Sequence, residues 1–213
     1  MICAPIKEKD INEVISMIKK VPRSFNLIEI WIDVVDKIDE NDILEICHAA
    51  KKKPLIFKFT KEIDFSFISS CLNKKVQYFD IDFASDQTTI QRIKTIIGGK
   101  KIILSHHDNM KTPLFTDILE IAQQMKLKGA DIVKIVTKAD KLEDNLITLR
   151  LLANASAIGI PVISFCSGNN GRMSRIYALK FGSFIDYILP SEKYRTAQGQ
   201  LLFKDFKKMR KCV

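Results

Sequence analysis

Eight short apolar runs, each followed by an amphipathic stretch, constrain the fold of this chain more than any other feature. The apolar runs predict strands at Ile2–Ile6, Leu27–Ile32, Leu55–Phe59, Tyr78–Phe83, Ile102–Ser105, Ile132–Val136, Val162–Phe165 and Phe184–Leu189. The stretches after them predict helices at Asp10–Lys20, Asp42–Lys52, Phe65–Leu72, Asp86–Ile97, Leu114–Lys128, Lys141–Ala157, Met173–Phe181 and Leu201–Arg210. Asp10, Asp42 and Asp86 stand where helix N-caps are expected.

Eight strand–helix units predict an α/β fold, a compact (β/α)8 TIM barrel that forms a single catalytic domain over residues 1–213. An open, doubly wound sheet is the alternative, but the units are regular and no GxGxxG motif follows a strand. In such barrels the functional side chains stand at the carboxyl ends of the strands. Polar residues that end or interrupt the apolar runs are therefore the candidate site residues.

Composition limits the partners and the compartment. No apolar run reaches the roughly 18 residues of a membrane-spanning helix, and the first residues do not have the organisation of a signal peptide. The net charge of +9 comes from lysines spread over many segments without an RNA-binding motif, so we expect a solvated surface and no nucleic-acid partner. The five cysteines form no CxxC pair and indicate free thiols in a reducing cytoplasm: Cys3, Cys47, Cys71, Cys166 and Cys212.

Lys134 interrupts the sixth apolar run. Alternation along a strand places Ile132, Lys134 and Val136 on one face and Val133 and Ile135 on the other. Because β-branched neighbours exclude water, we expect a lowered pKa for the Lys134 amine, which favours the neutral form that Schiff-base chemistry needs. A structural lysine whose ammonium reaches water is the alternative.

Charged residues also mark the ends of three other runs. Glu29, Trp31 and Asp33 share one face of the second run, and Asp80 and Asp82 share one face of the fourth. Two carboxylates inside a barrel are costly unless they are paired or used in chemistry.

The fifth run ends in Ser105-His106-His107-Asp108. Adjacent strands lie about 4.8 Å apart, so His107 and Lys134 can reach one substrate. An imidazole base beside an amine suits elimination, aldol or isomerisation through a Schiff base. We expect no metal site, because no third and fourth ligand stands at a recognisable spacing. Arg175, Thr196 and Gln200, later in the chain, offer donors for a carboxylate or phosphate.

These motifs together resemble type I 3-dehydroquinate dehydratase, a Schiff-base enzyme of the shikimate pathway. The most specific match is Asp80-Ile-Asp-Phe83, an eighteen-residue gap from 84 to 101, and then Ile102-Ile-Leu-Ser-His-His-Asp108. The segment Gly129–Lys134 resembles the one that bears the imine-forming lysine. Late motifs match at Ile163–Phe165, Ser174-Arg175 and Thr196–Gln200, so the resemblance runs from Ile2 to about Lys211.

The resemblance implies a mechanism without a metal or an organic cofactor. Lys134 forms an imine with the C3 ketone of 3-dehydroquinate, and His107 removes a C2 proton and then acts as the acid when the C1 hydroxyl leaves. Hydrolysis of the imine releases 3-dehydroshikimate. Arg175, Thr196 and Gln200 match residues that hold the substrate carboxylate and a neighbouring hydroxyl, and Glu29 matches a carboxylate near the histidine. Homodimers are common in the family, which makes a homodimer an expectation here.

The chain departs from the family pattern at two substrate-binding positions. Trp31 stands where the second strand of the family has arginine, and Thr60 replaces a second arginine after the third strand. Asp64 replaces the glutamate that follows, and Phe65-Ser66 replaces a pair of glycines. Loss of a charged hydrogen-bond donor costs about 1.5–3 kcal/mol. Lys58, on the same strand face as Thr60, is a candidate to replace one of the lost charges.

The sequence therefore leaves three functions in order of preference. The first is a 3-dehydroquinate dehydratase. The second is a Schiff-base lyase of the same fold with a different substrate, since Trp31 and Thr60 change the hydroxyl side of the site. The third is a non-catalytic barrel that binds a partner protein.

Overall fold

Strands and helices alternate along the chain as the sequence pattern predicts. The computed structural model describes residues 1–60, 64–73 and 75–211. The strands are β1 (Ile2–Ile6), β2 (Leu27–Trp31), β3 (Leu55–Lys58), β4 (Val76–Asp82), β5 (Lys101–Asp108), β6 (Ile132–Lys138), β7 (Val162–Ser167), β8 (Asp186–Leu189) and β9 (Leu201–Leu202). The α-helices are α1 (Ile11–Lys20), α2 (Glu40–Ala49), α3 (Phe65–Ser70), α4 (Gln87–Ile97), α5 (Phe115–Leu127), α6 (Asp144–Ala153), α7 (Ala155–Ile158), α8 (Arg172–Tyr177) and α9 (Phe203–Lys211). Two 3-10 turns are η1 (Ile32–Val34) and η2 (Glu192–Tyr194).

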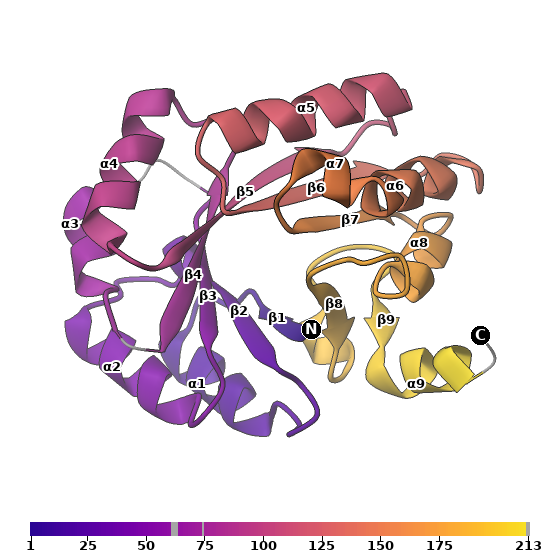
Figure 1. Ribbon diagram of the computed structural model, residues 1–213. Helices are drawn as coiled ribbons and strands as arrows, with labels where there is room; N and C mark the ends of the chain where they lie inside the picture. Colours follow the sequence, from indigo (N-terminus) through magenta and orange to yellow (C-terminus); the bar gives the residue numbers. More distant parts are fainter. Residues whose placement is uncertain (61–63, 74, 212–213) are drawn as a thin grey trace.

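All strands join one parallel sheet in the order β7-β6-β5-β4-β3-β2-β1-β8-β9. The sheet curls, and its helices lie on the outside of the curve (Figure 1). The pairing of the described residues places β7 at one edge of the sheet and does not join it to β8. The parallel α/β architecture is thus confirmed, whereas full closure into a (β/α)8 barrel is not shown by the strand pairing.

The two faces of the sheet carry separate apolar clusters. On β6, Val133 and Ile135 pack in the larger cluster between the sheet and the helices, while Ile132 and Val136 belong to a smaller cluster on the concave face. Lys134 lies between those last two residues and shares their face, as the alternation predicts. A polar side chain between the apolar residues of the concave face, as Lys134 is, is therefore placed in a confined interior.

The helices α1 to α4 start at aspartates whose side chains cap them. Asp10 accepts the backbone N–H of Asn12 at the start of α1, and Asp86 accepts that of Thr89 at the start of α4. The predicted cap at Asp42 is wrong by one turn. Asp39 caps α2, and the Asp42 carboxylate returns a hydrogen bond to the Asp39 backbone in a capping box.

The late elements differ most from the sequence prediction. The helix predicted over Lys141–Ala157 is interrupted at Asn154, whose side chain bonds to the Arg150 carbonyl, and continues as α7. The helix predicted to start at Leu201 begins at Phe203, because Leu201 and Leu202 first pair with β8 as β9.

Two further expectations from the sequence concern membrane-spanning helices and the cysteine thiols. Among the described residues, no helix is long and apolar enough to cross a membrane. Cys3, Cys47, Cys71 and Cys166 are buried free thiols, and Cys212 lies outside the described residues.

We predict that Phe79→Ala lowers the free energy of unfolding by about 3–5 kcal/mol. Phe79 is fully buried on β4, and its ring stacks on that of Phe59 with 6.3 Å between centroids. The matched control is Phe181→Ala, at a side chain that is 44% exposed, which should change stability by no more than about 0.5 kcal/mol. Urea unfolding of the three proteins measures the difference, and equal losses would contradict the assignment of Phe79 to the core.

Candidate active site

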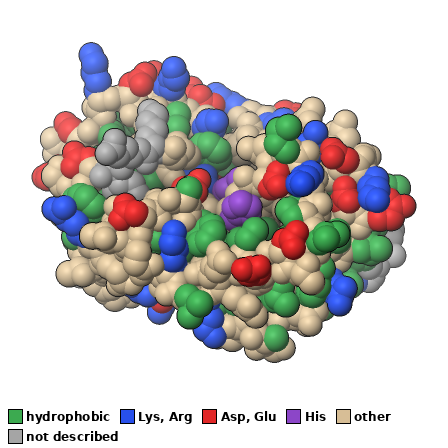
Figure 2. All heavy atoms as spheres, turned by 90° about the horizontal axis from the view of Figure 1, so that it is seen from above, with side chains coloured by type: hydrophobic (Ala, Val, Ile, Leu, Met, Phe, Trp, Pro, Cys, Tyr) green, Lys and Arg blue, Asp and Glu red, His purple; other side chains and the backbone are tan. Residues whose placement is uncertain are grey.

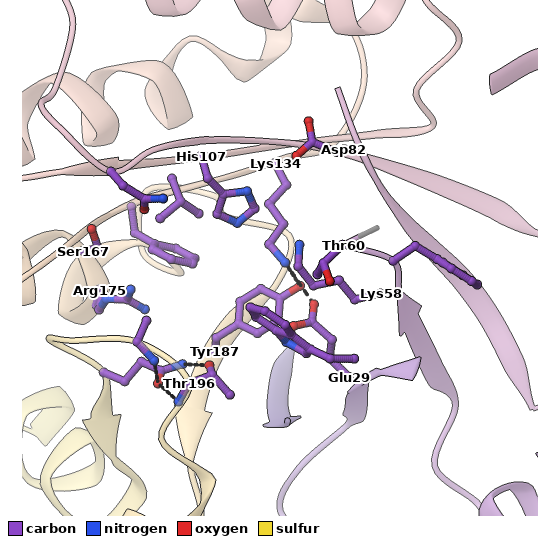
Figure 3. A pocket seen from close by; sticks show the side chains of 17 residues that line it. Glu29, Lys58, Thr60, Asp82, His107, Lys134, Ser167, Arg175, Tyr187 and Thr196 are labelled. Atoms are coloured by element: carbon purple, nitrogen blue, oxygen red, sulfur yellow. Dashed lines mark hydrogen bonds and ion pairs between the residues drawn. The ribbon is translucent and has the colours of Figure 1, made fainter. Parts of the chain in front are cut away.

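A cavity of about 360 Å³ lies at the carboxyl ends of the strands (Figure 3). It brings together all eight residues that the sequence predicts for the site: Glu29, Trp31, Thr60, His107, Lys134, Arg175, Thr196 and Gln200. In Figure 2, histidine side chains lie near the middle of the surface, and basic and acidic side chains are interspersed over the same face. Residues from seven strands and their loops thus converge on one cavity.

Lys134 is the most tightly held of these side chains. It is 3% exposed, and its Nζ donates to Glu29 Oε2 at 2.9 Å, Asp80 Oδ2 at 2.6 Å and the Tyr187 hydroxyl at 3.0 Å. All three donor positions of the ammonium are therefore used, two of them in charge-assisted bonds.

The predicted lowering of the Lys134 pKa is wrong. Burial does lower the pKa of Lys134, but Asp80 and Glu29 outweigh burial and raise it above its usual value. These two carboxylates lie on β4 and β2, 54 and 105 residues away in the chain, so the neighbours of Lys134 in sequence do not reveal them. Lys134 rests as an ammonium and has to lose a proton before it can act as a nucleophile.

Asp80 binds a second ammonium on its other oxygen. Lys58, at the end of β3, donates from Nζ to Asp80 Oδ1 at 3.3 Å and to Ser105 Oγ at 3.4 Å. Burial raises the pKa of Asp80, yet Lys134 and Lys58 together hold it well below its usual range. Asp80 is consequently a carboxylate shared between two lysines.

His107 is held in the neutral form. On β5, Ser105 pairs with Lys134 of β6, and His107 lies two residues further toward the carboxyl end, facing the same cavity (Figure 3). Burial, followed by the nearby charges of Lys58 and Lys134, lowers the pKa of His107 to about 3. Its neighbour His106 points to the other face, where its ring meets that of Phe83 edge-on. Of the two histidines, His107 is therefore the one placed to accept a proton from a bound ligand.

Arg175 enters the cavity from α8. Its Nε donates to the Cys166 carbonyl at 2.9 Å, and its guanidinium lies 4.2 Å from the centroid of the Phe165 ring. Burial lowers the pKa of Arg175 to about 10, against the opposing effect of Asp186. The side chain remains a cation at neutral pH and can receive an anionic group.

A loop from Thr196 to Gln200 covers one side of the cavity. Gln200 Oε1 accepts the backbone N–H groups of Thr196 and Ala197, and Gln200 Nε2 donates to Thr196 Oγ1 at 3.0 Å. Gly199, with φ of 81°, comes so close to Gly168 that a Cβ would lie 2.2 Å from the Gly168 carbonyl oxygen. Gly199 is thus required for the loop to lie against the chain after β7.

The two positions that depart from the family pattern have acquired other contacts. The backbone N–H of Thr60 donates to Asp33 Oδ2, and its hydroxyl lies 3.2 Å from both Asp33 oxygens, so this side chain ties the ends of β2 and β3. Trp31 is flanked by Lys7 and Lys58, with 4.3 and 5.4 Å from each Nζ to the ring centroid. Asp64 caps α3 and does not line the cavity.

Tyr187 belongs to no recognisable motif, so the sequence does not predict it, but its hydroxyl accepts a hydrogen bond from the Lys134 ammonium. Its only signal in the sequence is its place in the eighth apolar run, two residues after Ile185, which is buried in the same cluster. Asn109 and Ser167 also line the cavity, and no sequence motif predicts them.

We predict that His107 makes stability pH-dependent below pH 6.5. In the unfolded chain the imidazole has a pKa near 6.5, whereas in the native protein its pKa is about 3. Between these two pH values the unfolded chain binds a proton and the native protein does not, so the free energy of unfolding falls as the pH decreases. The slope from this one group is at most about 1.4 kcal/mol per pH unit. Urea unfolding of wild type and His107→Gln at several pH values should show a shallower fall for the variant; identical slopes would contradict a neutral, buried His107.

We predict that Gly199→Ala displaces the loop over the cavity. The new methyl group collides with the Gly168 backbone, which loosens the bonds from Gln200 to Thr196 and Ala197. Hydrogen exchange at those two amides should accelerate at least tenfold. Gly182→Ala is the matched control, because Gly182 also has positive φ but nothing lies within 4 Å of its Cβ position. Equal acceleration of these amides in both variants would show that general destabilisation, and not the contact with Gly168, decides the effect.

Comparison with known proteins identifies the family of this chain. A sequence model of the type I 3-dehydroquinase family matches residues 2–212. A 3-dehydroquinate dehydratase of Pyrococcus abyssi is 30% identical over 221 residues, covering 100% of this chain and 98% of the relative. One from Methanococcus maripaludis is 27% identical over 222 residues, with 100% of both chains covered.

Solved structures show the same fold. The 3-dehydroquinate dehydratase of Geobacillus kaustophilus superposes with a TM-score of 0.87 at 20% identity, covering 99% of this chain and 90% of the other. The type I enzyme of Clostridium difficile, solved with covalently modified comenic acid, gives 0.85 at 22% identity and covers 99% and 91%. With a family match over nearly its whole length and a full-length relative at 30% identity, the chain belongs to the type I 3-dehydroquinase family.

Proposed function

We propose that this protein is a 3-dehydroquinate dehydratase, which eliminates water from 3-dehydroquinate through an imine on Lys134 and yields 3-dehydroshikimate. The observation that carries the proposal is the buried Lys134 ammonium, held by two carboxylates in a cavity that also contains a neutral His107 and a cationic Arg175. An amine, a base and an anion receptor in one cavity are the parts that this elimination needs.

Imine formation fits the charge around Lys134. The ammonium loses one proton, the amine adds to the C3 carbonyl carbon, and the carbonyl oxygen leaves as water, which restores a positive charge as an iminium. Glu29 and Asp80, which raise the pKa of Lys134, then lie beside this iminium cation and stabilise it. The carboxylates thus hold a cation before and after the covalent step.

His107 carries the proton during elimination. The neutral imidazole takes the C2 proton, and the electron pair of the broken C–H bond moves toward the iminium to give an enamine. When that pair returns, the C1–O bond breaks, and the imidazolium donates its proton so that the hydroxyl leaves as water. A second water hydrolyses the imine and restores the Lys134 ammonium, so the net reaction loses one water and transfers no electrons.

The remaining cavity residues would position the substrate. Arg175 suits the C1 carboxylate, because a guanidinium binds a carboxylate in a planar, bidentate way. Thr196 approaches from the loop beside it (Figure 3), and Gln200 of the same loop also lines the cavity. Glu29, Trp31 and Thr60 stand on the opposite side, where we place the ring hydroxyls.

We also propose that residues 1–213 form one barrel domain in which β7 and β8 meet through side chains. Support comes from Phe165 of β7 and Tyr187 of β8, whose rings lie edge-on with centroids 6.0 Å apart, and from Arg175, whose pKa responds to Asp186 of β8. A homodimer and a cytoplasmic location stay predictions.

A Schiff-base lyase with a different substrate is the second candidate. It is favoured by one observation: Thr60 is bonded to Asp33, and Trp31 brings no charge of its own, so neither replaces a family arginine. Wild-type protein that forms a borohydride-reducible adduct with other ketones, but not with 3-dehydroquinate, would select this candidate. Absence of any adduct would instead favour a non-catalytic module.

The proposed function predicts that Lys134→Ala and Lys134→Arg both abolish turnover, lowering kcat by roughly a thousandfold or more. Arginine keeps a buried cation between the carboxylates but cannot form the imine, so it separates chemistry from folding. Lys138→Ala, on the same strand but at an exposed side chain, is the control and should retain activity. Absorbance of the enone product gives the rate, and the mass of the borohydride-reduced adduct locates the imine. Residual wild-type turnover in either Lys134 variant would overturn the Schiff-base mechanism.

A further inference from the structure

Lys58 is a second buried lysine in the cavity. It is 5% exposed at the end of β3, where it pairs with Trp31 on one side and Asp80 on the other. Its Nζ binds Asp80 Oδ1 and Ser105 Oγ. A buried lysine has a large desolvation cost, so its place in the cavity calls for an electrostatic reason.

The charges around Lys134 balance only when Lys58 is counted. Glu29 and Asp80 contribute two negative charges, and Lys134 and Lys58 contribute two positive ones. Lys58 and Lys134 bind opposite oxygens of the same Asp80 carboxylate. Without Lys58, the Lys134 ammonium would lie alone between two carboxylates, which would hold its proton still more strongly.

A nearby cation is a known way to make a lysine amine available. A second positive charge disfavours the ammonium and favours the neutral nucleophile. In this cavity the effect is needed, because Lys134 is tightly held by its two acidic partners.

We propose that Lys58 is a positioning residue for the dehydratase reaction: by sharing Asp80, it weakens the hold of that carboxylate on the Lys134 proton, and its charge acts on His107 across the same cavity. The inference rests on the proposed function. It assigns Lys58 an effect on Lys134 and His107, which differs from the direct replacement of a substrate-binding arginine.

The surroundings of His107 support the second half of this proposal. Positive charges facing it come from Lys58 on β3 and Lys134 on β6, with His106 beside it on β5. Asp80 acts in the opposite direction, and Asp82 of β4 and Glu29 of β2 line the same cavity. After burial, Lys58 is the largest cause of the lowered pKa of His107, so removal of its charge raises that pKa.

The test compares neutral and charged variants of Lys58. Lys58→Met removes the ammonium at similar volume, Lys58→Gln keeps a donor for Asp80 without the charge, and Lys58→Arg keeps the charge. Lys101→Met is the matched control, because Lys101 also lies 3.3 Å from an aspartate, Asp131, but at the exposed start of β5. If Lys58→Met does not fold, Lys58→Gln supplies the same comparison.

The first readout is the NMR titration of His107 without substrate, assigned by its loss in His107→Gln. We expect the pKa of His107 to rise by at least one unit in the neutral variants and to stay within half a unit of wild type in Lys58→Arg and Lys101→Met. The second readout is the pH profile of kcat/KM with 3-dehydroquinate. Because Lys134 acts in its deprotonated form, the neutral variants should need a higher pH to reach maximal kcat/KM and should lose at least tenfold at pH 7.

Two results would overturn the proposal. In the first, the neutral variants raise KM alone, with kcat, the pH profile and the His107 titration unchanged, and Lys58 then only contacts the substrate. In the second, Lys58→Arg is as impaired as Lys58→Met although both fold, which shows that shape and not charge matters. Failure of wild type to convert 3-dehydroquinate would instead refute the proposed function, while the titration, which needs no substrate, still decides the electrostatic effect of Lys58.

Discussion

A buried cluster of four charges organises the concave face of the sheet. Burial of single ions costs several kcal/mol each, and the cost is recovered only when every charge has a partner at good geometry. Here Glu29, Lys58, Asp80 and Lys134 come from β2, β3, β4 and β6, and each is within hydrogen-bond distance of an opposite charge. The cluster therefore requires these strands in this order and register, and it couples the fold to the chemistry.

This coupling explains why the reactive lysine is not held as a neutral amine. A neutral Lys134 would leave Glu29 and Asp80 with an excess of negative charge, so the resting network favours the ammonium. The same two carboxylates suit an iminium at the same place. In the proposed mechanism this arrangement stabilises the covalent intermediate at the expense of nucleophile formation, and we propose that Lys58 favours the formation of the nucleophile.

The opposite side of the cavity is built differently. Between β7 and β8, where the described backbone shows no pairing, side chains of Phe165, Tyr187 and Arg175 meet. The Arg175 guanidinium enters the cavity between β7 and β8, where the described backbone has no ladder of hydrogen bonds, and its Nε donates to the Cys166 carbonyl of β7. Close contact of Gly199 with Gly168 holds the loop that covers this side. On the far side, Thr60 and Trp31 have contacts within the protein, at the place where we propose that the ring hydroxyls bind.

Periodicity and capping by themselves determined the eight strands, their parallel arrangement and the face on which Lys134 lies, because these depend on alternation and on residues close in sequence. The order of the fifth and sixth apolar runs also determined that His107 and Lys134 stand on neighbouring strands. The protonation states depended on the tertiary structure. They are set by charges that lie 54 and 105 residues from Lys134 and by burial, and local sequence contains neither. For the same reason only the fold revealed Tyr187 as a partner of Lys134, and Lys58 as the second ammonium on Asp80.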